Sequence, residues 1–167
     1  MQRNPRPVFT DAGLQPVCNY SQRPRRQDVS EPVRVVFNGV TIAETMRATR
    51  VLEAGHPPTY YIPRNDVRME RLEAVFGASS YCEWKGVARY FDVRVNGRLA
   101  KRAAWSYPQP TQAFSALRNH LAFYAEPMDG CYVGDERVRP EAGAFYGGWT
   151  TNDDASPLGD EVESRDP

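Results

Sequence analysis

Two Asn-Gly dipeptides, each set between short apolar runs, most strongly constrain how this chain can fold. The dipeptide at 38–39 follows the alternating run 33–37, and the dipeptide at 96–97 follows the run 91–95. Asn and Gly accept the positive φ that a two-residue type I′ turn requires. We therefore predict two β-hairpins at these positions. Residues 132–138 carry a weaker version of the same pattern.

Helical signals are few. The segment 111–121 places Phe114, Leu117 and Leu121 at spacings of three and four, which predicts one helix with a single buried face. A second, shorter helix is expected between residues 65 and 75. The remainder consists of short apolar runs broken by Gly and Pro. We predict a mainly β, β-rich α+β fold: a compact sheet, barrel or tent-like domain with one or two short helices.

Composition divides the 167 residues into three parts. Residues 32–149 contain 17 of the 19 aromatic residues, so the core is expected there. Residues 1–31 contain five Arg and four Pro, whereas residues 150–167 contain six acidic residues against one Arg. Such segments bury too little apolar surface to offset their ordering entropy. We predict a mobile, basic, Pro-rich N-terminal segment (1–31), a single globular domain (32–149) and an acidic C-terminal tail (150–167).

Charge and cysteine content argue against several classes of protein. The formal net charge is zero and basic residues are not clustered, so nucleic acid is not an expected partner. No apolar run approaches the ~20 residues of a membrane span. Cys18, Cys82 and Cys131 are widely spaced, which favours reduced thiols and a cytoplasmic location. No metal-site spacing is present, and we expect no metal and no cofactor.

The two histidines occupy related places in the chain. His56 lies four residues before the aromatic pair at 60–61, and His120 lies three residues before the pair at 123–124. Together with the two hairpins, this pattern favours an internal duplication with pseudo-twofold packing. Such packing would place both imidazoles in a shared cleft.

Lys85 is the most informative candidate for a site. The chain contains two lysines against nineteen arginines, which suggests that a compact ammonium is needed at this position. A buried Lys85 could act as a base or nucleophile with a lowered pKa, or hold an anionic group as a point charge. The alternative is a surface lysine beside the turn residue Gly86. Cys82 lies three residues earlier and is either part of this site or a small buried apolar residue.

Several motifs together resemble one known family. In chain order they are Arg34-Val35-Val36-Phe37-Asn38-Gly39, Gly55-His56-Pro57-Pro58-Thr59-Tyr60-Tyr61, Tyr81-Cys82-Glu83-Trp84-Lys85-Gly86, Ala104-Trp105-Ser106-Tyr107, His120-Leu121-Ala122-Phe123-Tyr124 and Gly147-Gly148-Trp149. Over about residues 33 to 150 the chain resembles the bacterial family called domain of unknown function 427, sometimes labelled nucleotidyltransferase-like. The resemblance implies a compact β-rich domain without an assigned activity. Family members tend to continue with a Pro-Phe-Lys-Gly-like ending, which is absent here.

Two functions from different classes are compatible with these residues. The first is a small soluble domain that binds a small polar or anionic ligand in an aromatic-lined pocket. The second is a non-catalytic interaction or scaffolding domain whose aromatic residues form the core. The sequence specifies neither a reaction nor an oligomeric state. The candidate ligand-binding residues are Lys85, His56, His120, Cys82, Trp105, Tyr61, Tyr124 and Trp149.

Overall fold

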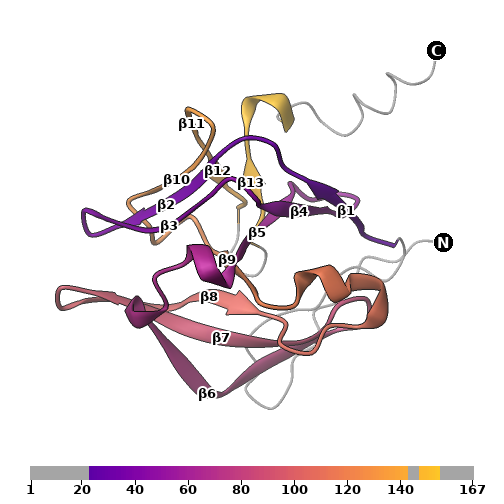
Figure 1. Cartoon of the computed structure of the whole chain (residues 1–167), viewed down its shortest axis with the longest axis horizontal. Helices are drawn as coiled ribbons and strands as arrows, with labels where there is room; N and C mark the ends of the chain where they lie inside the picture. Colours follow the sequence, from indigo (N-terminus) through magenta and orange to yellow (C-terminus); the bar gives the residue numbers. More distant parts are fainter. Residues whose placement is uncertain (1–22, 143–146, 155–167) are drawn as a thin grey trace.

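A computed structural model describes residues 23–142 and 147–154. The chain forms two open antiparallel sheets: β8, β7 and β6 of the larger sheet lie below the smaller sheet, whereas β1 and β4 lie level with it (Figure 1). The seven-stranded sheet contains, in spatial order, β1 (Arg25–Asp28), β4 (Thr49–Leu52), β5 (Thr59–Pro63), β9 (His120–Phe123), β8 (Arg98–Ser106), β7 (Gly86–Val95) and β6 (Leu72–Cys82). The four-stranded sheet contains β11 (Glu136–Arg137), β10 (Gly130–Val133), β2 (Val33–Phe37) and β3 (Val40–Thr45), and a separate pair joins β12 (Arg139–Pro140) to β13 (Trp149–Thr150).

The mainly β prediction is confirmed, and so are both Asn-Gly hairpins. Asn38 and Gly39 have φ of 49° and 77°, and Asn96 and Gly97 have φ of 48° and 86°. These are the left-handed values of a type I′ turn, and they connect β2 to β3 and β7 to β8. The weaker signal at 132–138 also forms a hairpin, between β10 and β11. Among the described strands the sheets stay open, so no barrel closes.

Short helices are present in both predicted segments, but they are 3-10 helices and are shorter than predicted. The segment 111–121 contains a 3-10 helix, η3 (Gln112–Leu117), and then enters β9. It cannot continue as a helix because Arg118 is extended, with ψ of 139°, and Asn119 has φ of 61°. The spacing did identify buried side chains, since Phe114 and Leu117 are buried. Between 64 and 71 lie two short 3-10 turns, η1 (Arg64–Asp66) and η2 (Met69–Arg71), and β6 begins directly after them.

The seven-stranded sheet is buried on both faces at its centre. Successive side chains of a strand point to opposite faces. Tyr60 and Ile62 of β5 therefore enter the larger core, between the two sheets, while Tyr61 enters a second core on the other face. In β9, Ala122 likewise faces the second core, while its neighbours Leu121 and Phe123 face the larger one. The second core is the environment of the candidate site.

The folded part of the chain extends beyond residues 32–149 at both ends. Residues 25–28, which the sequence analysis placed in the N-terminal segment, form β1 and pair with β4. Thr150 belongs to β13, Thr151 is buried, and η4 (Asn152–Asp154) follows. Residues 1–22 and 155–167 of the predicted terminal segments lie outside the described residues.

The arrangement does not show the internal duplication. The hairpin β2–β3 lies in the four-stranded sheet and the hairpin β7–β8 in the seven-stranded one. The two strands that follow the histidine motifs, β5 and β9, do pair with each other in antiparallel register. The duplication therefore stays a prediction.

The turn at Gly97 provides a test of backbone strain. An added Cβ would meet nothing within 4 Å, so Gly97→Ala adds no clash and changes the backbone preference alone. Because φ is 86°, we expect Gly97→Ala to lower the free energy of unfolding by about 1–2 kcal/mol in urea denaturation. The control is Asn96→Gly, which suits its own positive φ and should change stability by less than about 0.5 kcal/mol. Equal stability of Gly97→Ala and wild type would contradict the turn assignment.

Candidate functional site

Lys85 lies in the tight turn between β6 and β7 and is 4% exposed. Its Nζ donates a hydrogen bond to Oε2 of Glu53 at 2.6 Å, which makes a largely buried ion pair. Glu53 directly follows β4, whereas Lys85 comes from the opposite end of the strand order. Thr111 fixes the turn, because its backbone N–H donates to Lys85 O at 3.2 Å and its hydroxyl to Trp84 O at 2.5 Å. The turn is thus tied to two other segments, through its ammonium to Glu53 and through its backbone to Thr111.

The surroundings of Lys85 keep its side chain charged. Burial by itself lowers the pKa of this ammonium, but the Glu53 carboxylate, with smaller contributions from Tyr107 and Tyr61, outweighs it. The net result is a pKa raised above its ordinary value. A neutral lysine acting as base or nucleophile near pH 7 needs the opposite shift. The structure therefore favours Lys85 as a fixed positive charge.

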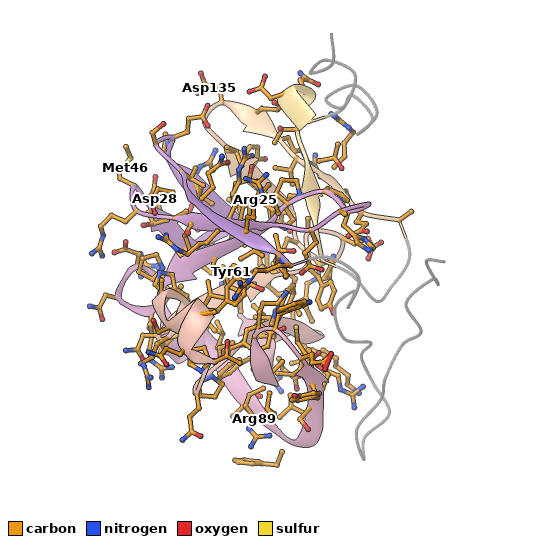
Figure 2. All side chains as sticks on the ribbon, turned by 90° about the vertical axis from the view of Figure 1, so that its right-hand side faces the viewer. Arg25, Asp28, Met46, Tyr61, Arg89 and Asp135 are labelled. Atoms are coloured by element: carbon orange, nitrogen blue, oxygen red, sulfur yellow. The ribbon has the colours of Figure 1, made fainter. Side chains whose placement is uncertain are left out.

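Four aromatic side chains form a group in the second core, and two of them, Tyr107 and Tyr61, lie close to this charge. Tyr61 lies near the centre of the molecule (Figure 2), with Trp105 at 6.5 Å and Tyr107 at 6.4 Å between ring centroids. Trp105 also contacts Tyr124, with 4.7 Å between centroids. The Lys85 Nζ lies 5.8 Å from the centroid of Tyr107, within range of a cation–π interaction. Burial raises the pKa of the phenols of Tyr61, Tyr107 and Tyr124, so all three are neutral hydroxyl groups.

A second ionisable pair lies beside the first. His56 Nδ1 is 2.6 Å from Oε2 of Glu141, and both side chains are mostly buried. The other carboxylate oxygen of Glu141 accepts the backbone N–H of Gly148 at 3.1 Å. The hydrogen bond with Glu141 is the main cause of a raised His56 pKa, which burial opposes. Glu53 raises the same pKa further and Lys85 lowers it, which places all four groups within electrostatic reach of one another.

We call Lys85, Glu53, His56 and Glu141 the Lys85 cluster. Its formal charge is zero when His56 is protonated, because two cations face two carboxylates. When His56 is neutral the sum becomes −1. The cluster therefore places hydrogen-bond donors and acceptors close together while its net charge stays at zero or −1. Protonation of one imidazole changes that balance in a pH range close to neutrality.

Cys82 is buried, which was one of the two alternatives, but it is not the reduced thiol that the sequence predicted. Its Sγ accepts a hydrogen bond from the Lys85 backbone N–H at 3.3 Å. It is disulfide-bonded. The expectation of three reduced thiols is therefore wrong for Cys82, and the cysteine argument for a cytoplasmic location no longer holds. Cys131 is a free, buried thiol.

Two further candidates do not join the Lys85 cluster. His120 begins β9 instead of lying on a helix, and its Nδ1 interacts with Arg118 O at 2.9 Å. Trp149 belongs to the larger core, where it stacks on Tyr60 at 5.1 Å and donates from Nε1 to Phe123 O at 2.9 Å. The structure thus brings together Lys85 and His56 with the aromatic residues Tyr61, Trp105 and Tyr124.

The sequence analysis missed Glu53 and Glu141, the two carboxylates that position the cations. Glu53 lies three residues before His56, a spacing that offered a weak signal. Glu141 lies far along the chain in a segment without a motif, so it could not have been found in this way. Within residues 23–142 and 147–154, no three His, Cys, Asp or Glu side chains come together as a metal-binding group. In the same ranges, no helix is long and apolar enough to cross a membrane.

The chain is a small β-rich domain whose larger sheet is buried on both faces at its centre. The Lys85 cluster is a largely buried group of side chains with balanced charges. The chain belongs to the family described as domain of unknown function DUF427 (NTP_transf_9), whose model matches residues 25–134. This match covers about two thirds of the chain and confirms the resemblance seen in the motifs. Lys85, Glu53 and His56 lie within the matched region, whereas Glu141 lies beyond it. No curated protein matches the chain.

The buried ion pair predicts a non-additive pair of substitutions. Lys85→Met leaves the Glu53 carboxylate without its partner, so we expect a loss of about 3–5 kcal/mol in the free energy of unfolding. Lys85→Met combined with Glu53→Gln removes both charges and should recover more than half of that loss. Urea denaturation measures both, and Lys101→Met, at the exposed second lysine, is the control. Additive losses in the double variant would show that the two side chains are not coupled.

The His56–Glu141 contact predicts a measurable titration. The His56 ring should titrate above 6.5 in wild type, and Glu141→Gln should bring it down because the main stabilising hydrogen bond to the charged ring is weakened. A raised pKa in the folded state stabilises the fold below the unfolded value, and this contribution is lost as the pH rises through the folded value. NMR titration of the His56 imidazole protons in wild type and in Glu141→Gln measures the shift. A His56 pKa unchanged by Glu141→Gln would contradict the assigned contact.

Proposed function

We propose that the Lys85 cluster and its aromatic neighbours bind a small polar molecule that carries at most one negative charge. The observation that supports this proposal is a lysine kept charged in the interior, at 4% exposure, beside a histidine whose pKa is raised. Burial of an ion pair is costly, and replacement by apolar residues is often neutral or stabilising. A purely structural role would therefore be served as well by apolar packing.

The charge balance limits the class of ligand. A ligand group that approaches Lys85 competes with Glu53, whose oxygen already lies 2.6 Å from the ammonium. Glu141 adds a second negative charge on the far side of His56. A polyanion such as a nucleoside triphosphate would meet two carboxylates and one or two cations, so its net attraction is small. A neutral polar group or a single carboxylate is the better match.

The aromatic neighbours supply shape and hydrogen-bonding capacity. Trp105, Tyr61, Tyr107 and Tyr124 offer flat apolar surfaces, and neutral phenols both donate and accept hydrogen bonds. Ligand sites commonly combine such walls with a few convergent polar groups. This combination favours a compact ligand with both an apolar part and a polar part.

An interaction domain is the second candidate, and a separate observation favours it. Of the four exposed large apolar side chains in the described residues, Phe76, Tyr81 and Val87 lie on the β6–β7 hairpin. The fourth, Met46, follows β3. The exposed side chains of this hairpin are distinct from the buried side chains of the Lys85 cluster, so the two functions are compatible with each other.

A thermal-shift screen tests the ligand-binding function. The panel contains small neutral amides and sugars, monocarboxylates, phosphate and nucleoside triphosphates, each measured against wild type. A ligand present at about 100 times its Kd should stabilise the fold by about 2.7 kcal/mol. The paired variant Lys85→Met with Glu53→Gln should lose this response, whereas Lys101→Met should keep it. A panel without a stabilising member, or equal responses in the paired variant, would contradict the proposal.

Binding of a monoanion should depend on the protonation of His56. Protonated His56 brings the cluster to zero charge, so the affinity for a monocarboxylate should fall by about tenfold per pH unit once the pH exceeds the His56 pKa. A neutral ligand of the same shape should show little change. Isothermal titration calorimetry between pH 6 and 9 measures both, and His56→Gln should remove the dependence. A monoanion whose affinity does not change with pH would place its charged group away from His56.

A further inference from the structure

A pocket lies at the edge of the larger core, where the β10–β11 hairpin leads into β12 (Figure 1). Its volume is about 290 Å³, near the lower limit for sites of small molecules. Its inner part is apolar, because Met128, Cys131 and Val138 are only 6%, 1% and 4% exposed. These three residues belong to the larger core, whereas the aromatic neighbours of Lys85 belong to the second core. The pocket is therefore separate from the Lys85 cluster.

Three charged residues line the outer part of the pocket, and all three are exposed: Glu126, Arg137 and Arg139. The two arginines flank Val138, whose backbone N–H donates to Cys131 O at 2.9 Å. This hydrogen bond holds the segment 137–139 against β10. The formal charges of the three residues sum to +1. The pocket thus combines an apolar interior with a mouth of net positive charge.

Arg137 is held by one hydrogen bond and keeps donors for a ligand. Its Nη2 donates to Asp129 O at 2.7 Å, which uses one of the five N–H groups of the side chain. Burial raises the pKa of the Cys131 thiol, and the charge of Arg137 opposes that shift. The guanidinium therefore lies within electrostatic reach of the pocket interior. The Asp129 carboxylate accepts the Gly39 N–H at 2.7 Å and does not line the pocket.

Arg139 also keeps most of its hydrogen-bonding capacity. Its Nη1 lies 3.5 Å from Asn152 Oδ1 and 3.7 Å from Glu136 Oε2, and its side chain is 51% exposed. Contacts of this length at an exposed position contribute little. The same oxygen of Glu136 already accepts the Asn152 N–H at 2.6 Å. A ligand carboxylate, which would form a charge-assisted pair with the guanidinium, can therefore compete with both partners.

We propose that this pocket binds a small monocarboxylate with an apolar body. Its carboxylate lies between Arg137 and Arg139, and its hydrocarbon part packs against the apolar interior. The net charge of +1 at the mouth matches one negative charge, and Glu126 opposes a second one. Burial of the hydrocarbon part supplies the remaining affinity. This site is additional to the one proposed at the Lys85 cluster and does not depend on it.

Isothermal titration calorimetry of the full chain with hexanoate tests the site. We expect a Kd of about 0.1–1 mM, whereas hexanamide, which has the same chain without the charge, should bind at least about tenfold more weakly. Arg137→Gln and Arg139→Gln should each raise the Kd for hexanoate by about tenfold. Glu126→Gln removes the opposing charge and should lower the Kd about two- to threefold. Arg118→Gln, at an exposed arginine outside the pocket, is the control and should leave the Kd unchanged.

NMR of ¹³C-labelled methionine methyl groups locates the bound ligand, because Met128 lines the pocket. Hexanoate should shift the Met128 resonance, and the shift should persist in the paired variant Lys85→Met with Glu53→Gln, in which the other site has lost its ion pair. Circular dichroism verifies that each variant is folded.

Four results would each overturn the proposal. They are hexanamide that binds as tightly as hexanoate, a Kd unchanged in both arginine variants, a Met128 resonance that does not move at 10 mM hexanoate (about ten times the highest expected Kd), and a response lost in the paired variant. The last result would assign hexanoate to the Lys85 cluster, so failure at one site is distinguishable from failure at the other.

Discussion

The structure depends on a sheet whose central strands are buried on both faces. In β5, Tyr60 and Ile62 pack against the four-stranded sheet, while Tyr61 between them packs against η3 and the β6–β7 hairpin. If β5 were buried on one face only, either the larger core would lose Tyr60 or the Lys85 cluster would lose Tyr61. The alternation of side chains along a strand therefore links the stability of one half of the molecule to the geometry of the other. The candidate site lies on the face of the sheet opposite to the larger core.

The Lys85–Glu53 pair shows how this arrangement makes a charged site in an interior. Glu53 comes from the end of β4, and Lys85 comes from the turn beyond β6, five strands away in the order of the sheet. These ends nonetheless meet, since the Lys85 Nζ lies 2.6 Å from Glu53 Oε2, and Thr111, just before η3, binds the backbone of the Lys85 turn. Since the carboxylate outweighs the effect of burial, the ammonium stays charged. The site thus presents a fixed positive charge with a neutralising partner, in contrast to an isolated cation.

Sequence reasoning succeeded where local chemistry determines structure. The Asn-Gly turns were identified because few residues adopt positive φ at both turn positions, and the structure has those values. It failed at 111–121, where apolar spacing identified the buried Phe114 and Leu117 but could not show that Asn119 interrupts the helix. Lys85 stood out by its rarity, and His56 by its position before an aromatic pair. Glu53 and Glu141 were missed because their roles follow from contacts across 32 and 85 residues of sequence.

The contacts of Glu141 and Trp149 have a consequence for what counts as the domain. The family match ends at residue 134, yet Trp149 fills the larger core beside Tyr60, and Glu141 holds His56. A chain that ended at residue 134 would lack Trp149, which would leave a cavity in the larger core. It would also lack Glu141, so His56 would lose its carboxylate partner. The region that the family model matches is therefore shorter than the region that forms the larger core and the site. In this protein Glu141 belongs to the site and Trp149 to the larger core.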